Sequence, residues 1–429
     1  MTLNKKFLVV CGLFISAVFF QGCGDALGIL TGSAGTLQGP TNGVSLGVVT
    51  GPNVMALTVN GGNCAGGSYA NKPCVNVTVC APGDTSNCQT ISDILLDTGS
   101  YGLRVFKSAM NTTLSNAILA SPVLVTTNTV AECVQFGDGT SDWGSVDNAT
   151  LLLGSEPAVN APIQVIDKSF TGQAVNCSGA DASPAVAGFN GIMGVGLFVQ
   201  DCGATCAGGT SGLYYACNTT GGTCSGSAVP LAKQVTNPIA LIPADPTNGG
   251  QADNNGVIVR LPLVGLGGVN NADGYIIFGI GTRSNNTPSA VNTYTADPSS
   301  GRFSSNFAGR NGLTSFLDSG SNGLFFPPGS SGLVSCSSSS WYCPAATTSL
   351  TATNISHSGA ISGTIPFSVG NTDALDGTAN SVFIELGANS TVGGSSVFDW
   401  GLPFFLGRNV YVGFSGKTST LGTGPYWSY

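Results

Sequence analysis

Charged residues and histidine are scarce in this sequence. Only 8% of its 429 residues are charged, with 13 Lys and Arg against 21 Asp and Glu, and histidine occurs once. The basic residues form no cluster, which argues against a nucleic-acid partner because phosphate binding needs concentrated Lys and Arg. The single histidine, His357, lies in a Ser- and Gly-rich stretch. We therefore expect it to be a solvated loop residue rather than a metal ligand.

Apolar runs of membrane-spanning length are also absent beyond the N-terminus. Lys5 and Lys6 precede an apolar run over residues 7–20, which is too short to cross a bilayer comfortably. This pattern predicts a signal peptide over residues 1–22. Gly22-Cys23 resembles the lipobox of bacterial lipoproteins, so we expect lipidation of Cys23, with plain secretion as the alternative. Residues 23–50 would then form a tether from a membrane anchor in the cell envelope.

Short apolar runs are abundant and favour strands. VMALTV (54–59), VNVTVC (75–80) and ISDILL (91–96) are typical of strands, and no stretch has convincing helical periodicity. Gly, Ser, Thr and Asn carry most of the polarity, and 21 Pro punctuate the chain. The chain is too long for one ordinary core. The sequence therefore predicts an all-β protein with two lobes or domains.

Twelve cysteines remain after Cys11 is removed with the signal and Cys23 is assigned to lipid. In an oxidising compartment an even number predicts disulfides. Cys336 and Cys343 are close enough to close one loop. A Gly- and Thr-rich insertion needs stapling by its own four cysteines, namely Cys202, Cys206, Cys217 and Cys224. A zinc site is the alternative, disfavoured by one histidine and the lack of any CxxC pair.

An internal repeat is the most informative feature of the chain. Residues 96–103 read LDTGSYGL and residues 317–324 read LDSGSNGL, and each follows an apolar residue or pair. An apolar strand ending in Asp-Thr/Ser-Gly-Ser predicts a tight turn in which backbone N–H groups and a serine hydroxyl donate to the carboxylate. We expect support for the two acids from Thr98, Gly99, Ser100, Ser319, Gly320 and Ser321.

Two duplicated turns can meet on a pseudo-two-fold axis, which would bring Asp97 and Asp318 together. Carboxylates a few ångströms apart cannot both ionise cheaply, so the pair holds one proton. The ionised member can then take a proton from water while the protonated member donates to a scissile carbonyl. This chemistry requires no metal, cofactor or histidine. The motifs therefore predict Asp97 and Asp318 as a catalytic dyad.

These motifs resemble the pepsin-like aspartic peptidases. FNGIMGVGL (189–197) is similar to the segment that crosses behind the first Asp turn, GYIIFGIG (274–281) to a strand near the lobe junction, and WGLPFFLGRNVYVGF (400–414) to the segment behind the second Asp turn. The order and approximate spacing hold from about residue 72 to 415. The resemblance implies a bilobal all-β fold with a cleft between an N-terminal lobe (51–282) and a C-terminal lobe (283–429).

The flap is where the sequence departs from the family. A β-hairpin over residues 133–154 is similar to the flap, with Phe136, Gly137, Asp138 and Gly139 at its tip. Phe136 stands where the family has tyrosine, and Arg104 stands where it has the supporting tryptophan. We expect a rebuilt flap that uses Trp143 or Arg104, with Phe136 and Ile192 as candidate subsite walls. Asp399 occupies a position that is apolar in the family.

The resemblance implies an exported, monomeric aspartic endopeptidase that binds an extended peptide or protein substrate and uses neither cofactor nor metal. No basic prosegment lies between Cys23 and Lys72, so self-inhibition by charge is not expected. The altered flap leaves open a pepsin-like surface lipoprotein that binds peptides or other ligands without cutting them. A structural or adhesive all-β protein is the third hypothesis, and it predicts that Asp97 and Asp318 lie far apart.

Overall fold

The computed structural model describes residues 43–65, 69–137, 139–390 and 396–429. The predicted signal segment, the candidate lipidation residue Cys23 and the flap residue Asp138 therefore lie outside the described residues. The chain is predominantly β, with several sheets, which confirms the all-β prediction. Among the described residues, no helix is both long and apolar enough to cross a membrane.

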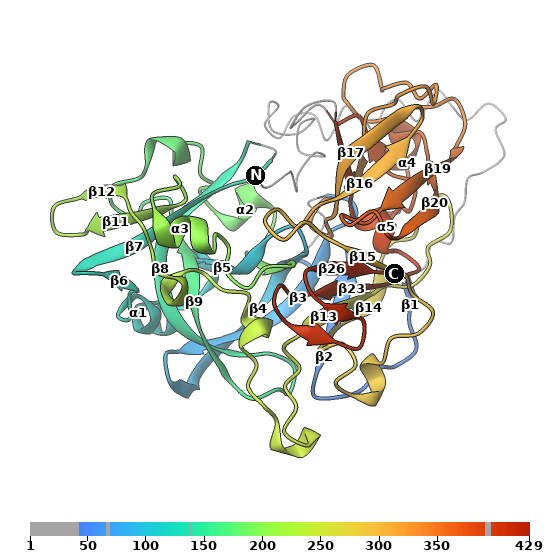
Figure 1. The fold of residues 1–429 in the computed structure, drawn as a ribbon. Coiled ribbons are helices and arrows are strands. Elements are labelled where there is room, and N and C mark those ends of the chain that lie inside the picture. The colour runs from blue at the N-terminus through green and yellow to red at the C-terminus, as the bar shows by residue number, and fades with distance from the viewer. Residues whose placement is uncertain (1–42, 66–68, 138, 391–395) are drawn as a thin grey trace.

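One hydrogen-bonded network of 17 strands contains most of the first two thirds of the chain together with two C-terminal strands (Figure 1). Its members are β1 (Val44–Ser45), β2 (Val54–Val59), β3 (Pro73–Ala81), β4 (Asp84–Asp97), β5 (Tyr101–Phe106), β6 (Leu124–Val125), β7 (Asn128–Gln135), β8 (Ser141–Leu152), β9 (Val159–Ile166), β10 (Gly191–Val195), β11 (Tyr214–Asn218), β12 (Thr223–Gly226), β13 (Gly256–Arg260), β14 (Ala272–Phe278), β15 (Thr293–Thr295), β23 (Asn409–Gly413) and β26 (Tyr426–Ser428).

A second sheet has seven strands, which are coloured from yellow-orange to red in Figure 1. They are β16 (Phe303–Phe307), β17 (Arg310–Leu317), β18 (Leu324–Phe325), β19 (Thr348–Ile355), β20 (Ser362–Val369), β21 (Gly387–Ala388) and β22 (Val397–Trp400). A small pair is formed by β24 (Thr418–Ser419) and β25 (Gly422–Thr423).

Helices in the described residues are short, in agreement with the absence of helical periodicity. They are α1 (Thr112–Leu119), α2 (Pro184–Ala187), α3 (Ala204–Gly208), α4 (Thr372–Asp376) and α5 (Leu402–Phe405), with 3₁₀ turns η3 (Lys107–Ala109), η4 (Val175–Cys177), η5 (Leu231–Lys233), η6 (Pro238–Leu241), η7 (Pro246–Asn248) and η8 (Ser284–Asn286). The eight-residue α1 is capped by Asn111, whose side chain accepts from Leu114 N, and it buries Leu114 and Ile118 one turn apart.

The strands follow the sequence patterns. In β3, Val75, Val77 and Val79 are fully buried while Asn76 is exposed, which is the alternation that a strand with one core face requires. The run VMALTV coincides with β2. The segment predicted as a tether includes the short strand β1, which pairs in parallel with β14.

The same three-strand arrangement occurs twice. In the first half, β10 lies between β4, to which it is parallel, and β5, to which it is antiparallel. In the second half, β22 lies in the same way between β17 and β18. In each case the outer strands flank one copy of the Asp motif. The internal repeat in the sequence is therefore a repeat of structure.

Strands distant in sequence join the two halves. The C-terminal strand β23 pairs with β13, so that Val412 lies opposite Val257, and β26 pairs with both β23 and β15. Hydrogen bonding within this sheet thus crosses residue 282. A single buried apolar cluster also extends from Met55 to Trp427 and includes side chains of both halves. The shared sheet and the shared apolar cluster therefore fix the position of one half of the chain relative to the other half.

All twelve cysteines of the described residues form disulfides, as predicted, and this pairing is typical of an exported protein. The expected Cys336–Cys343 bond is present, and the insertion carries two short bonds, Cys202–Cys206 and Cys217–Cys224. The others are Cys64–Cys74, Cys80–Cys88 and Cys133–Cys177. His357 is half exposed, as expected of a loop residue.

The disulfides should differ in their contribution to stability. Cys133 and Cys177 are 44 residues apart, whereas Cys202 and Cys206 are 4 apart, and the longer loop restricts the unfolded chain more. Replacing the first pair by alanine should lower the free energy of unfolding by about 4 kcal/mol, and the second by about 2 kcal/mol. Guanidinium titration of both double variants measures the difference. Equal losses would contradict this account.

Candidate active site

The two Asp turns face each other. Asp97 ends β4, and Asp318 directly follows β17; both carboxyls are buried. A Cβ on Gly99 would lie 2.5 Å from Asp318 Oδ2, and a Cβ on Gly320 would lie 2.6 Å from Asp97 Oδ1. Each acid therefore occupies the space that a side chain on the opposite turn would need. Glycine is required at both positions because the turns approach so closely.

Four hydrogen bonds lock the turns together. Ser319 N donates to Thr98 Oγ1 over 2.9 Å, and Thr98 N donates to Ser319 Oγ over 3.1 Å. Each hydroxyl then donates to the carbonyl that precedes the opposite acid, with Thr98 Oγ1 2.9 Å from Leu317 O and Ser319 Oγ 2.8 Å from Leu96 O. The arrangement is reciprocal, and its four members are buried. Thr98 and Ser319, which were expected to support the two acids, thus do so by bonds between the turns.

Each carboxyl also accepts bonds from its own turn. Gly99 N donates to Asp97 Oδ1 and Gly320 N to Asp318 Oδ1, both over 2.9 Å. Ser100 Oγ donates to Asp97 Oδ2, and Ser321 Oγ lies 3.2 Å from Asp318 Oδ2. These donors favour ionisation, while the neighbouring like charge opposes it.

The two carboxyls are within a few ångströms of each other. Asp97 Oδ1 and Asp318 Oδ1 lie 2.6 and 3.1 Å from the place that a Cβ on Gly320 would occupy. Their separation therefore cannot exceed the sum of these two distances. The hypothesis of two unrelated surface turns required the acids to lie far apart, and this geometry contradicts it.

The segments behind the turns fix their backbone. Gly194 of β10 lies opposite Asp97, and a Cβ there would be 2.4 Å from Tyr101 N. Trp400 O accepts from Asp318 N over 3.1 Å, and a Cβ on Gly401 would be 2.0 Å from Gly323 O. Behind each turn, a glycine therefore allows the neighbouring backbone to pack directly against the backbone of the turn. Gly194 of the segment 189–197 and Gly401 of the segment 400–414 thus pack against the two turns, whereas β23, later in the second segment, pairs with β13 and β26.

Asp399 is a third carboxyl at this site, and its role was not predicted from the sequence. It is buried on β22, and its Oδ2 lies 2.6 Å from Ser321 Oγ. Burial, reinforced by the charge of Asp318, raises the pKa of Asp399 well above its ordinary value. The sequence did contain a sign of this role, because an acidic residue stands at position 399 where the first half has the apolar Ile192.

A hairpin forms where the flap was expected. Strands β7 and β8 are antiparallel, and the tip is closed by Phe136 N donating to Thr140 O and Gly139 N donating to Phe136 O. Phe136 is 5% exposed and belongs to a buried cluster with Leu95 and Ile192. Phe136 and Ile192, considered as subsite walls, are thus core residues in this state.

Arg104 does not lie at the tip of the hairpin but in a buried ion-pair network. Its Nη2 is 2.6 Å from Glu132 Oε1 on β7 and 3.0 Å from Asp201 Oδ2. Tyr214 Oη donates to Asp201 Oδ1 over 2.7 Å. Burial and the adjacent Glu132 raise the pKa of Asp201, which favours its neutral form. One guanidinium can then balance the negative charge of the network. Arg104 therefore fastens the first strand of the hairpin to β5.

Trp143 also lies away from the hairpin tip. It is fully buried on β8, packs against Phe170 and Tyr215, and donates from Nε1 to Phe170 O. Its strand neighbour Cys133 carries the disulfide to Cys177. Trp143 thus supports the base of the hairpin on the side of the cysteine-rich insertion.

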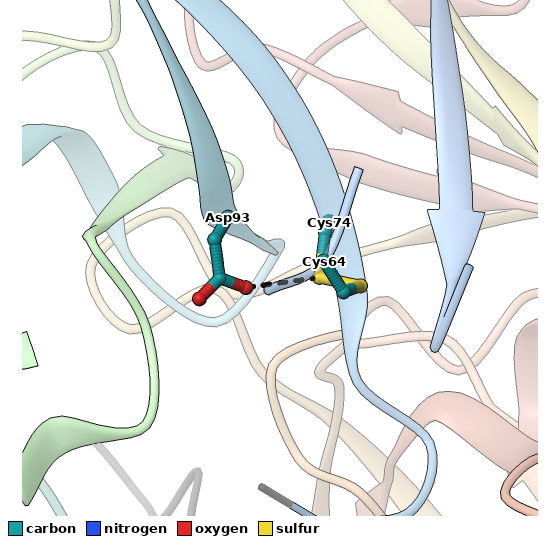
Figure 2. A group of neighbouring side chains, drawn as sticks. All are labelled: Cys64, Cys74 and Asp93. Atoms are coloured by element: carbon teal, nitrogen blue, oxygen red, sulfur yellow. Dashed lines mark hydrogen bonds between the residues drawn. A yellow bond between two sulfur atoms is a disulfide. The ribbon is translucent and has the colours of Figure 1, made fainter. Parts of the chain in front are cut away.

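Within the described ranges, two groups of side chains have the donor types of a metal site. They are Cys64, Cys74 and Asp93, shown in Figure 2, and Cys336, Cys343 and Asp373. In both groups the cysteines are joined by a disulfide, so no thiolate is available to bind a cation. This removes the basis of the zinc alternative at these cysteines.

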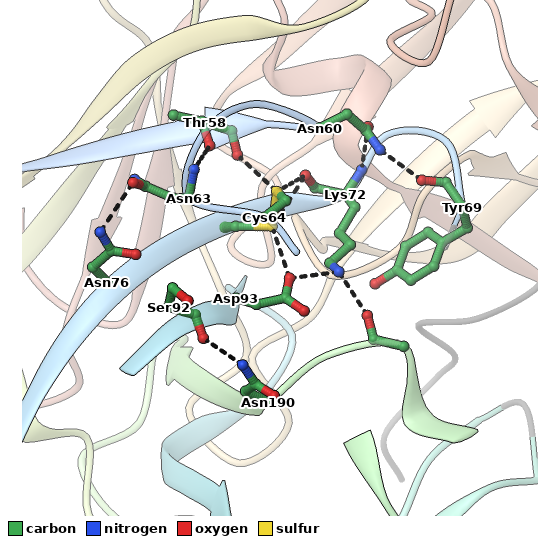
Figure 3. The surroundings of a disulfide bond; sticks show 12 residues. Thr58, Asn60, Asn63, Cys64, Tyr69, Lys72, Asn76, Ser92, Asp93 and Asn190 are labelled. Atoms are coloured by element: carbon green, nitrogen blue, oxygen red, sulfur yellow. Dashed lines mark hydrogen bonds and ion pairs between the residues drawn. A yellow bond between two sulfur atoms is a disulfide. The ribbon is translucent and has the colours of Figure 1, made fainter. Parts of the chain in front are cut away.

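The first of these groups belongs to a buried clamp on the Asp97 strand (Figure 3). Lys72 Nζ lies 2.5 Å from Asp93 Oδ1 and donates to Gly188 O over 2.7 Å. Burial lowers the pKa of Lys72 and raises the pKa of Asp93. The clamp therefore connects β4 to the chain that leads into β10.

The neighbouring Asn71 extends this clamp to the second Asp turn. Its Nδ2 donates to Asn322 O over 2.8 Å and to Phe383 O over 2.9 Å, while its Oδ1 accepts from Phe383 N over 2.7 Å. Asn322 directly follows Ser321 of the repeat. Asn71 is fully buried, so these groups have no access to water. No sequence motif pointed to Asn71.

Comparison with known proteins gives a family and no activity. Residues 49–429 match a family model described as "Protein of unknown function (DUF3443)". No curated protein matches the chain. Both Asp turns, the hairpin and the Asn71 clamp lie within the matched residues.

Asn71 should contribute strongly to stability. Replacing it with glycine keeps its left-handed backbone, for which φ is 58°, but leaves three buried backbone groups without partners. We expect the free energy of unfolding to fall by about 3 kcal/mol. The exposed Asn76 provides the control, since Asn76→Ala should cost under about 0.5 kcal/mol. Urea denaturation compares them; a similar small loss in both would refute the clamp.

Proposed function

The chain belongs to the DUF3443 family, and we propose that it is an exported aspartic endopeptidase with a bilobal, pepsin-like fold and Asp97 and Asp318 as its catalytic dyad. One observation carries the proposal. Two copies of one Asp turn are held face to face by the reciprocal bonds of Thr98 and Ser319, with both acids buried. Two buried carboxyls placed side by side are energetically costly, so turns with only a structural role would not be expected to keep them.

The geometry supports a general acid–base mechanism. Two buried carboxyls this close hold one proton between them, so one is a base and the other an acid. The base removes a proton from water as its oxygen attacks the scissile carbonyl carbon, and the acid protonates the carbonyl oxygen. The resulting diol collapses when the amide nitrogen receives the proton taken from water and one diol hydroxyl returns its proton to the carboxylate that had acted as the acid. The dyad then returns to its starting state, and no metal or cofactor takes part.

The repeated strands support the proposed fold. An arrangement of β4, β10 and β5 in the N-terminal lobe (51–282) has its counterpart in β17, β22 and β18 of the C-terminal lobe (283–429). Strands β23 and β26 of the second lobe extend the sheet of the first. The hairpin of β7 and β8 supplies the flap, whose backbone can bind an extended peptide by strand-like hydrogen bonds.

A second candidate function is peptide binding without cleavage. The observation that favours it is the rebuilt hairpin, where Phe136 packs into the core and Arg104 is held by Glu132 and Asp201. A flap of this kind offers no hydroxyl to the substrate at that position. The intact dyad and its complete set of donors favour catalysis over this alternative. In both cases the protein would be a lipid-anchored or secreted monomer of the cell envelope.

The protein lacking residues 1–22 and folded under oxidising conditions should cleave a mixed peptide library between about pH 3 and 7. Pepstatin should block the cleavage. Asp97→Asn or Asp318→Asn should lower kcat at least about 1,000-fold, because one ionised and one protonated carboxyl are both needed.

Asp373→Asn, which changes an exposed acid on α4, is the matched control and should retain full activity. Undiminished cleavage by either dyad variant would exclude the proposed mechanism. If the folded protein binds pepstatin but cleaves no peptide, the binding function becomes the better account.

A further inference from the structure

The dyad is asymmetric because a third carboxyl touches one of its members. Asp399 is 2% exposed, and its Oδ2 lies 2.6 Å from Ser321 Oγ. The same hydroxyl oxygen lies 3.2 Å from Asp318 Oδ2. Asp399 Oδ1 has no hydrogen-bond partner in the described part of the chain. Asp399, Ser321 and Asp318 thus form a continuous carboxyl–hydroxyl–carboxyl chain.

In the described part of the first half, the equivalent position on the backing strand carries no carboxyl. On β22, Asp399 lies opposite Phe316, two residues before Asp318; on β10, Ile192 lies opposite Leu95, two residues before Asp97. The two backing positions are therefore equivalent, and only the second carries an acid. Asp399 is therefore a carboxyl beside Asp318 that has no counterpart at the equivalent position beside Asp97.

The protonation state of Asp399 decides which carboxyl receives the hydrogen bond of the Ser321 hydroxyl. A serine hydroxyl has one proton to donate. If Asp399 is ionised, the shorter contact draws that proton toward Asp399, and Asp318 loses it. If Asp399 is protonated, its own O–H donates to Ser321 Oγ, and the Ser321 proton is directed to Asp318.

The surroundings of Asp399 favour its protonated form. It faces Phe316 on β17 and Phe325 on β18, and the charged group that acts on it is Asp318. A buried carboxylate with one unpaired oxygen beside a like charge is costly, whereas the neutral acid is not. The raised pKa of Asp399 agrees with this geometry.

We propose that protonated Asp399 is a positioning residue, which turns the Ser321 hydroxyl toward Asp318 and makes Asp318 the ionised member of the dyad. The inference rests on the proposed peptidase function. Asp318 then takes the proton from water, and Asp97 donates its proton to the scissile carbonyl oxygen. Asp399 keeps its own proton throughout, so the reaction remains balanced as a hydrolysis.

Two substitutions separate this role from a purely structural one. In Asp399→Asn, the amide N–H can donate to Ser321 Oγ at every pH and cannot ionise. In the wild type, ionisation of Asp399 at high pH would draw the Ser321 proton away from Asp318, and the Asn variant cannot do this. The alkaline fall in kcat should therefore move up by about one pH unit, with KM unchanged. Asp399→Ile copies the equivalent Ile192 and removes the donor, so kcat should fall about tenfold. An Asn profile that superimposes on the wild-type profile, or full kcat in the Ile variant, overturns the proposal.

Infrared spectroscopy tests the proton without turnover. Besides the bands of other protonated carboxyls such as Asp97, the wild-type protein at neutral pH should show one carbonyl band of a buried protonated carboxyl that Asp399→Asn abolishes, while Asp373→Asn retains it. If the band survives in Asp399→Asn, the proposal fails even when peptide cleavage is established. If the band disappears in Asp399→Asn but the wild type cleaves nothing, the proton on Asp399 is supported and the peptidase function is what fails.

Discussion

Two buried carboxyls are held within a few ångströms of each other, and the structure around them is organised to keep them there. Repulsion and desolvation both act to separate or neutralise the pair. The four bonds between Thr98, Ser319 and the carbonyls before each acid resist this separation. They use backbone groups at the ends of buried strands, so the carboxyls can move apart only if the sheets do. Rigidity of the sheets therefore keeps the two carboxyls together.

The support for the pair comes from three directions. Glycines at 194 and 401 let the backing strands reach the turns. The Lys72–Asp93 pair holds the first of these strands in place, and Asn71 crosses to the second turn. Each support is buried and has few alternatives, since a larger residue clashes and a smaller one leaves polar groups unpaired. The site is thus specified by backbone packing as much as by the acids.

The sequence predicted the parts of this site that are encoded locally. The repeat of Asp97 and Asp318 was visible because a strand, an acid and a glycine turn occupy eight consecutive residues, and the strands were visible from their alternation. Asn71 was not, because its partners are 251 and 312 residues away and an asparagine in a loop carries no signal of its own. Arg104 was noticed as a substitution, but only the fold could place Glu132 and Asp201 around it. Phe136 was assigned to a cleft and lies in the core, because an apolar residue at a hairpin tip fits either surrounding.

The pairing of β23 and β26 with strands of the first sheet has a consequence for the order in which the chain folds. Val412 must reach Val257, and Trp427 must reach Tyr294, before the sheet between the halves is complete. Contacts of such sequence separation form late, because their loop-closure entropy is lost before they contribute any stability. A chain whose C-terminal strands have not yet paired therefore carries both acids but lacks the complete sheet that joins the two halves. If the protein is the hydrolase proposed above, this order of assembly keeps it inactive until its C-terminal strands are in place.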